Sequence, residues 1–231
     1  MSRFRLYGSG GRPVYDSDGE PADRRLERIK REFHAGVAAF HDPAAGLVRA
    51  QVTVHRRSPE QFVATYQSDD DEDHLAALFD RVADLAERRG WTVQRGLGGT
   101  QALYDALEDG SAFESDALAA VETDLADRSI APADLRDAVA DLGAVDLLVP
   151  DYDVAAAALA YVRVTFEEYA VAVSESTDLG TIAGADVVIR PTGLADRDRA
   201  SPGPELSEWV QLRHGGAPAD SLHDARASLA D

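Results

Sequence analysis

The sequence predicts an α+β fold: a mostly antiparallel sheet of two hairpins plus short strands, with helices packed on it and a helical insert around 100–142. Two stretches of alternating apolar and polar residues, 47–67 and 161–174, each contain a turn and predict the hairpins. Other stretches carry apolar residues at spacings of three and four, the repeat of a helix that is buried on one side.

A strand and a long helix are expected to begin the chain. Arg3–Tyr7 is a short strand that runs into a glycine-rich turn. The helix is expected to begin near Pro21, which suits a first helical turn, and to reach about Phe40. Its apolar stripe has helical spacing: Leu26, Ile29, Phe33, Val37 and Phe40.

The first hairpin and a second helix are expected next. Leu47–His55 and Gln61–Gln67 alternate as strands do and are separated by Arg-Arg-Ser-Pro. The acidic run Asp69–Asp73 suits the N-terminus of the following helix, because the helix dipole favours negative charge there. Gly90 ends this helix, and Trp91–Gln94 is a short strand.

Residues 100–142 carry only helical patterns. Thr100–Glu108 is the first helix of this insert. Ser111 and Glu114 have the spacing of a capping box, which predicts the start of the second helix. Pro132 is expected to begin the third.

The remainder of the chain is expected to complete the sheet. Val145–Val149 is a short buried strand, and Asp186–Arg190 is another. Between them, Tyr161–Phe166 and Tyr169–Ser174 alternate and predict the second hairpin.

The chain of 231 residues suits one large domain or two small ones, at roughly 100–200 residues per domain. We expect one α+β domain over residues 1–195. Residues 196–231 are expected to form a polar loop and a marginally helical tail.

The composition excludes several classes of protein. With no cysteine, the chain has neither disulfides nor cysteine-based metal centres nor a thiol nucleophile. No run without a charge is longer than Val154–Val162, which is far shorter than the roughly 20 residues that a membrane span needs. The N-terminus lacks an apolar core of signal-peptide length. These features predict a cytoplasmic protein without a membrane partner.

The charge balance resembles that of proteins from extreme halophiles. The formal net charge is −19, Asp outnumbers Glu by 28 to 14, and the chain has 22 Arg but one Lys. A dense carboxylate surface stays hydrated in concentrated salt and keeps molecules apart. A cationic partner is the alternative explanation of the acidic excess, but adaptation to salt accounts for it alone.

The best local signal for a ligand site is a glycine turn between a strand and a helix, formed by Arg95, Gly96, Gly98, Gly99 and Thr100. Free backbone N–H groups and the helix dipole make such a turn favourable for an anion. The turn has neither the lysine of a P-loop nor the third glycine of a dinucleotide fingerprint. A plain turn into a helix is the structural alternative.

A pair of carboxylates, Asp151 and Asp153, follows an apolar strand and could hold Mg²⁺. The string from Val149 to Val154 resembles the first motif of the haloacid-dehalogenase phosphatases. That resemblance implies a later basic residue, for which Arg190 would have to stand in, because the only lysine, Lys30, precedes the motif. The structural alternative is a solvated loop with a helix cap.

The N-terminal segment is basic although the chain as a whole is acidic. Residues 1–57 hold 11 basic and 7 acidic groups, net +4, which leaves −23 for residues 58–231. Five basic residues crowd the first predicted helix: Arg24, Arg25, Arg28, Lys30 and Arg31. They could face an acidic protein or, second, a nucleic acid. Alternatively, they pair with the protein's own carboxylates.

Two classes of function follow. We favour a non-enzymatic binding module that uses the basic N-terminal helix, because no coherent catalytic set is visible. The alternative is a small enzyme that binds a phosphorylated ligand at residues 95–100, with Asp151 and Asp153 as metal or acid–base groups. The enzyme is favoured if Gly98 and Asp151 line one pocket. No cofactor can be assigned.

The net charge of −19 predicts a stability that depends on salt. Like charges repel less as the Debye length falls from about 30 Å at 0.01 M salt to about 3 Å at 1 M. The melting temperature should therefore rise between dilute buffer and molar KCl, as measured by calorimetry. A flat melting temperature over that range would contradict adaptation to salt.

Overall fold

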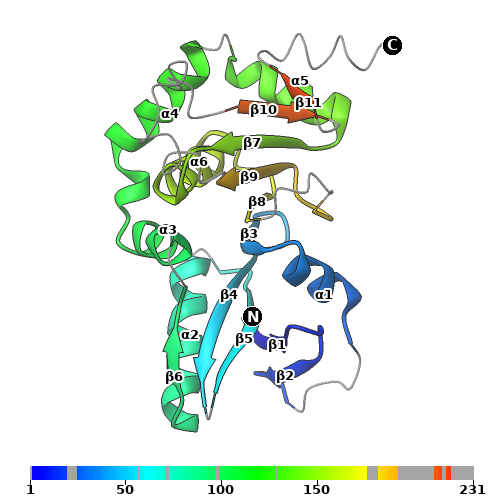
Figure 1. Cartoon of the computed structure of the whole chain (residues 1–231), viewed down its shortest axis with the longest axis vertical. Coiled ribbons are helices and arrows are strands. Elements are labelled where there is room, and N and C mark those ends of the chain that lie inside the picture. The colour runs from blue at the N-terminus through cyan, green and yellow to red at the C-terminus, as the bar shows by residue number, and fades with distance from the viewer. Residues whose placement is uncertain are drawn as a thin grey trace, which may run out of the picture.

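The computed structural model describes residues 2–19, 25–56, 58–70, 73–96, 99–127, 130–175, 182–191, 211–214 and 217–219. The fold is α+β, with a mostly antiparallel sheet that runs along the length of the molecule (Figure 1). The strand order is β11-β10-β7-β9-β8-β3-β4-β5-β1-β2, and β6 pairs with β4 beside this path.

The strands are short except at the centre of the antiparallel half. Their bounds are β1 Arg3–Gly8, β2 Pro13–Asp16, β3 Val37–Asp42, β4 Leu47–His55, β5 Pro59–Gln67, β6 Thr92–Gln94, β7 Val145–Val149, β8 Val171–Ser174, β9 Val187–Pro191, β10 Gln211–His214 and β11 Ala217–Ala219. The pairs β7–β9 and β8–β9 are parallel, and the other pairs are antiparallel.

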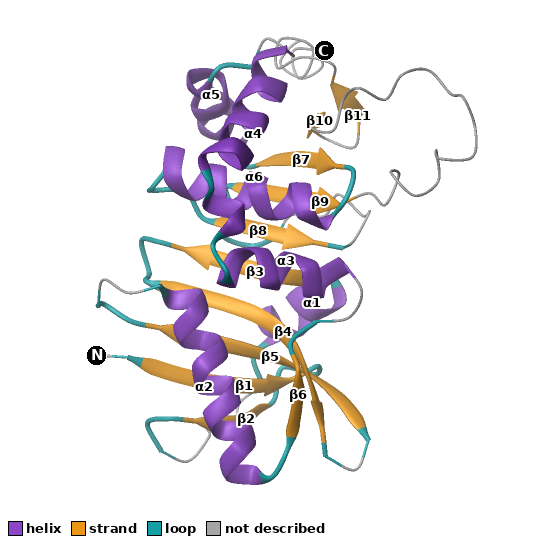
Figure 2. Ribbon diagram, turned by 90° about the vertical axis from the view of Figure 1, so that its left-hand side faces the viewer, coloured by secondary structure: helices purple, strands orange, loops and turns teal. Residues whose placement is uncertain are grey.

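Helices cover the two faces of the sheet unequally. The helices are α1 Glu27–His34, α2 His74–Arg89, α3 Gly99–Glu108, α4 Ser115–Asp127, α5 Pro132–Leu142 and α6 Tyr152–Thr165, with a 3₁₀ turn, η1, at Ser111–Phe113. In Figures 1 and 2, α2 to α6 lie on one face and α1 lies on the other. The main apolar core lies under α2 to α6, where Val52 and Val54 of β4 are buried with Leu78 of α2.

The local signals for helix ends were mostly correct. Asp73 caps α2 by accepting from the backbone N–H groups of the next turn, and Gly90 ends this helix with a φ of 65°. Pro132 begins α5, as predicted. The expected capping box was wrong, because Ser111 begins the 3₁₀ turn and Glu114 ends it just before α4.

The predicted helix from Pro21 to Phe40 was wrong over its C-terminal part. The α-helix begins at Glu27 and ends at His34, and Gly36 turns the chain with a φ of 60°. Residues 37–42 then form β3, which pairs with β4 on one side and β8 on the other. The spacing of Val37 and Phe40 suited a helix, but all four residues from 37 to 40 are apolar and equally suit a central strand.

The predicted second hairpin was also wrong, because Tyr161–Phe166 is not a strand. Residues up to Thr165 belong to α6, and only Val171–Ser174 forms a strand, β8. Alanine is the strongest helix former, and the alanine-rich run 155–160 extends the helix through the alternating residues that follow. Four of these alanines are fully buried, namely Ala155, Ala156, Ala158 and Ala160.

The described part of the C-terminal tail forms strands instead of the expected marginal helix. β10 pairs antiparallel with β7, and β11 pairs with β10. The rest of the tail, and the expected loop that precedes it, lie outside the described residues.

The sheet forks between β3 and β4. The ladder that joins these two strands ends at the pair Ala39–Ala50, after which β3 stays with β8. β4 continues alongside β5 and takes β6 as its new neighbour at the pair Thr53–Gln94. Figure 2 shows β4 and β5 curving away from β3 toward β6. Backbone groups in the fork therefore lose the partners that a continuous ladder would supply.

The hydroxyl of Tyr104, on α3, occupies this fork. It donates to the carbonyl of Ala38 at 2.5 Å and accepts from the backbone N–H of Gln51 at 3.2 Å. The side chain is completely buried, and this burial raises the pKa of Tyr104, so the hydroxyl stays protonated. The Tyr104 hydroxyl thereby makes hydrogen bonds in place of the ladder that ends here, and it links α3 to both strands.

Replacing Tyr104 by Phe should destabilise the protein by about 1–3 kcal/mol, the cost of leaving buried polar groups without partners. Denaturant unfolding in molar KCl measures this. Tyr15→Phe is the matched control, since the Tyr15 hydroxyl has no hydrogen-bond partner among the described residues. Equal losses in the two variants would contradict the role assigned to Tyr104.

Candidate functional site

A cavity of about 110 Å³ opens at the fork of the sheet. One side is formed by β4 through Gln51, Val52 and Thr53, together with Gln61 of β5. The opposite side is formed by the predicted glycine turn, through Arg95, Gly96 and Thr100, and by Glu175 at the end of β8. Three of the five residues predicted to bind an anion therefore line one cavity.

The glycine turn requires glycine because of its close contacts. A Cβ atom on Gly96 would lie 2.6 Å from the backbone nitrogen of Gln101, in the first turn of α3. A Cβ atom on Gly99 would overlap the ring of Tyr152. Gly98 lies outside the described residues. The turn is thus held between α3 and the N-terminus of α6, which places the two motifs singled out in the sequence side by side.

Glu175 is held in the cavity by contacts from two elements. Its backbone N–H donates to the carbonyl of Gly36 at 2.8 Å, and its Oε1 accepts from the hydroxyl of Tyr152 at 2.8 Å. Burial and the hydrogen bond to Glu175 both raise the pKa of Tyr152. Tyr152 therefore stays protonated and remains a hydrogen-bond donor to the Glu175 carboxylate.

The cavity offers neutral polar groups between a positive and a negative end. Thr53 is 6% exposed, and its hydroxyl has no hydrogen-bond partner among the described residues. The guanidinium of Arg95 pairs with Glu108 and lies over the ring of Phe79, 5.1 Å from its centroid. Because that charge is balanced, the remaining positive character comes from the N-terminus of α3. The negative end is the carboxylate of Glu175.

The carboxylates proposed to hold a metal act differently from each other. The Asp151 carboxylate accepts from the N–H of Val154 at 2.9 Å and caps α6, whereas Asp153 is exposed in the first turn. Among the described residues, no group of three His, Asp or Glu side chains is placed to hold a metal ion. Arg190, the expected basic partner, bonds Asp146 at 2.6 Å. Asp151 does not line the cavity that contains the glycine turn.

Arg28, from the basic N-terminal helix, is engaged within the protein. Its Nε donates to Glu32 at 2.8 Å, and its Nη2 donates to the carbonyl of Ala183 at 2.7 Å. Glu32 is buried and also pairs with the buried Arg49 at 3.1 Å. Arg28 therefore contributes to the packing of α1 on the sheet.

The other described basic residues near α1 are exposed. Arg25, Lys30 and Arg31 all face solvent. The Lys30 ammonium lies 3.9 Å from the carboxylate of Glu27, and Arg31 donates to the Glu27 carbonyl within the same helix. Arg24 lies outside the described residues. A small basic surface therefore remains on α1 and the residues just before it, formed by Arg25, Lys30 and Arg31.

The sequence interpretation missed the groups that face the glycine turn. These are Gln51, Thr53, Gln61, Tyr152 and Glu175. A signal existed for Glu175, which directly follows a strand just as Asp151 follows β7. Ligand groups gather where parallel strands end, but the parallel pairing of β8 was hidden by the expected hairpin.

Comparisons with models of protein families, with curated proteins and with solved structures found no match. Within the described residues, no helix has the length and apolar character needed to cross a membrane. Function is therefore inferred from the chemistry of the sites themselves.

Proposed function

We propose that this protein binds a small zwitterion, with an anionic group and an ammonium group, in the cavity at the fork of the sheet. The observation that carries the proposal is the placement of Glu175 in one cavity with Gly96 and Thr100 of the glycine turn. The two ends have opposite electrostatic character, so a ligand that carries both charges is favoured over a simple anion.

The anionic group of the ligand would lie at the N-terminus of α3. The first backbone N–H groups of a helix have no partner within it and carry partial positive charge. Gly96 has no side chain to cover this end, and Thr100 faces the same cavity. A carboxylate or a phosphate suits this end, which retains the phosphorylated ligand expected from the sequence.

The ammonium group of the ligand would lie at Glu175. Tyr152 donates to Oε1 of this carboxylate, so the second oxygen is left to accept from the ligand. Thr53 and the amides of Gln51 and Gln61 supply neutral donors and acceptors between the two ends. Such contacts are short-ranged, so they survive the concentrated salt of the cytoplasm in which we propose that the protein works.

Four small probes test the proposal by backbone NMR titration in molar KCl: alanine, O-phosphoethanolamine, propionate and ethylamine. We expect shifts at Thr53, Gly96 and Thr100 with the two probes that carry both charges, and weaker binding of the other two. Glu175→Gln should weaken alanine binding about tenfold, because a hydrogen bond between charged groups contributes about 1.5–3 kcal/mol.

The control is Glu167→Gln, which removes the same charge from an exposed position outside the cavity. It should bind alanine as the unaltered protein does. Absence of shifts at millimolar probe, or equal affinity of the Glu175 and Glu167 variants, would overturn the proposal.

The basic surface of α1 supports a second candidate function, the binding of an acidic protein. Its specific support is that Arg25, Lys30 and Arg31 remain exposed in a chain of net charge −19. Arginine suits contacts in high salt, because its planar group makes paired hydrogen bonds and stacks on aromatic rings.

Reversing Arg25, Lys30 and Arg31 to Glu should remove a protein partner from pull-downs at molar KCl without lowering the melting temperature. Arg28→Glu is the contrasting variant, which should melt lower because it breaks the bonds to Glu32 and Ala183. Loss of a nuclease-sensitive species instead would indicate a nucleic acid. Retention of every partner by the triple variant would remove this candidate.

A further inference from the structure

A second cavity, of about 210 Å³, lies between α2 and the end of the sheet formed by β1 and β2. It lies on the face that α2 covers and shares no lining residue with the cavity at the fork. Its walls combine aromatic rings from the strands with arginines from the helix, which is an unusual combination in so acidic a chain.

The floor of this cavity is aromatic. Phe4 of β1 and Tyr66 of β5 are 3% and 1% exposed. Tyr15 of β2 is half-buried, with its ring centroid 5.8 Å from that of Phe4 and the two rings tilted by 47°. A flat ring placed here gains apolar burial and edge-to-face contacts, which aromatic side chains favour.

The wall of the cavity is formed by Arg81 and Arg88. They are seven residues apart on α2, so they lie two turns apart on the same side of the helix. Nε of Arg88 donates to the backbone carbonyl of Asp84 at 3.2 Å, and its guanidinium has no carboxylate partner within the described part of the chain. Arg81 has no carboxylate partner among the described residues. Two guanidinium groups that pair with none of the described carboxylates therefore line one cavity.

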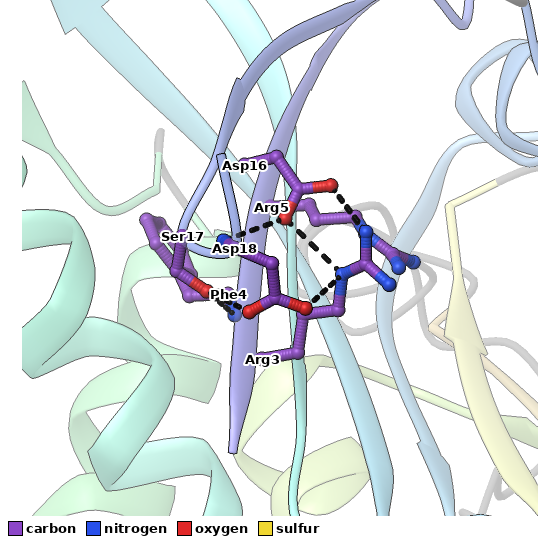
Figure 3. A network of polar contacts seen from close by, with 6 residues as sticks. All are labelled: Arg3, Phe4, Arg5, Asp16, Ser17 and Asp18. Carbon is purple, nitrogen blue, oxygen red and sulfur yellow. Dashed lines mark hydrogen bonds and ion pairs between the residues drawn. The ribbon is translucent and has the colours of Figure 1, made fainter. Parts of the chain in front are cut away.

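The acidic residue at the rim of the cavity, Asp18, forms an ion pair with Arg3 of β1 and not with the arginines of α2. Figure 3 shows the network that holds it. The carboxylate of Asp18 lies 2.9 Å from Nε of Arg3, and Asp16 pairs with Arg3 at 2.6 Å and with Arg5 at 3.1 Å. The hydrogen bond from Arg3 holds the pKa of Asp16 at about 2, so both carboxylates balance the two arginines of β1.

This network also fixes the rim in place. The hydroxyl of Ser17 accepts from the backbone N–H of Phe4 at 3.0 Å and donates to Asp18 at 3.2 Å. The turn after β2 is therefore held against β1 at the edge of the cavity. Because Asp18 is bound to Arg3, it does not cancel the charges of Arg81 and Arg88.

We propose that this cavity binds a single-ring aromatic acid, with the ring on Phe4, Tyr15 and Tyr66 and the acid group at Arg81 and Arg88. The cavity is smaller than the roughly 300–1,000 Å³ of pockets for drug-sized ligands, so one ring fills it. Arginine forms paired hydrogen bonds to either a carboxylate or a phosphate.

The experiment is a calorimetric titration in molar KCl with benzoate, phenyl phosphate, the neutral amide benzamide, and acetate. Benzoate should bind saturably. Benzamide lacks the charged acid group and acetate lacks the ring, so each should bind at least about tenfold more weakly than benzoate, which corresponds to about 1.4 kcal/mol. Phenyl phosphate tighter than benzoate identifies a phosphate ester as the natural acid, and the reverse identifies a carboxylate.

The double variant with Arg81→Ala and Arg88→Ala should lose at least about tenfold in benzoate affinity, in line with loss of charge-assisted hydrogen bonds. Arg89→Ala is the matched control, because this neighbour on α2 lies over Trp91 instead, 5.9 Å from the ring centroid.

Tyr15→Ala tests the aromatic floor of the cavity and should weaken the binding of benzoate more than the binding of acetate. Melting temperatures verify that each variant folds. Equal binding of benzoate and benzamide, or an unchanged affinity in the double variant, would overturn the proposal.

Discussion

The separation of β3 from β4 beyond the pair Ala39–Ala50 is the constraint on which the rest of the structure depends. β3 is the strand that joins the antiparallel half of the sheet to the parallel strands β8, β9 and β7. Where it leaves β4, backbone groups need new partners, and the Tyr104 hydroxyl supplies them. The same separation opens the space into which Glu175 and the glycine turn project. The candidate site is thus a consequence of how the sheet divides.

Among the described residues, some arginines form internal ion pairs and others line two surfaces. Arg49 is 5% exposed, pairs with Glu32, and lies 3.9 Å from the centroid of the Phe40 ring. Burial lowers the pKa of Arg49 to about 10, which shows how costly this position is for a cation. Arginine tolerates such a place better than lysine because its weakly hydrated plane stacks on aromatic rings. Part of the basic N-terminal segment therefore serves the fold.

Helix ends were predictable from the sequence, and long-range pairing was not. Asp73, Gly90 and Pro132 act through backbone groups within one turn of their own position, so their effect does not depend on distant residues. Residues 37–40 and 161–165 were misassigned, because their apolar patterns suit either a helix or a strand. Their neighbours decide the structure. Residues 37–40 form a strand because they pair with β4 and β8, and residues 161–165 are helical because they continue the alanine-rich start of α6.

By itself, the sequence determined the α+β class, the helical insert, the acidic surface charge and the place of the glycine turn, since composition and short spacings specify these. Only the tertiary structure decided that this turn faces Glu175 and packs on Tyr152, and that Asp151 caps a helix. It also decided that Arg81 and Arg88 of α2 line the same cavity as Phe4 of β1. These groups are far apart along the chain. The pairing of β8 with β3 and β9 places Glu175 beside the turn, and the packing of α2 on the sheet places Arg81 and Arg88 beside β1 and β2.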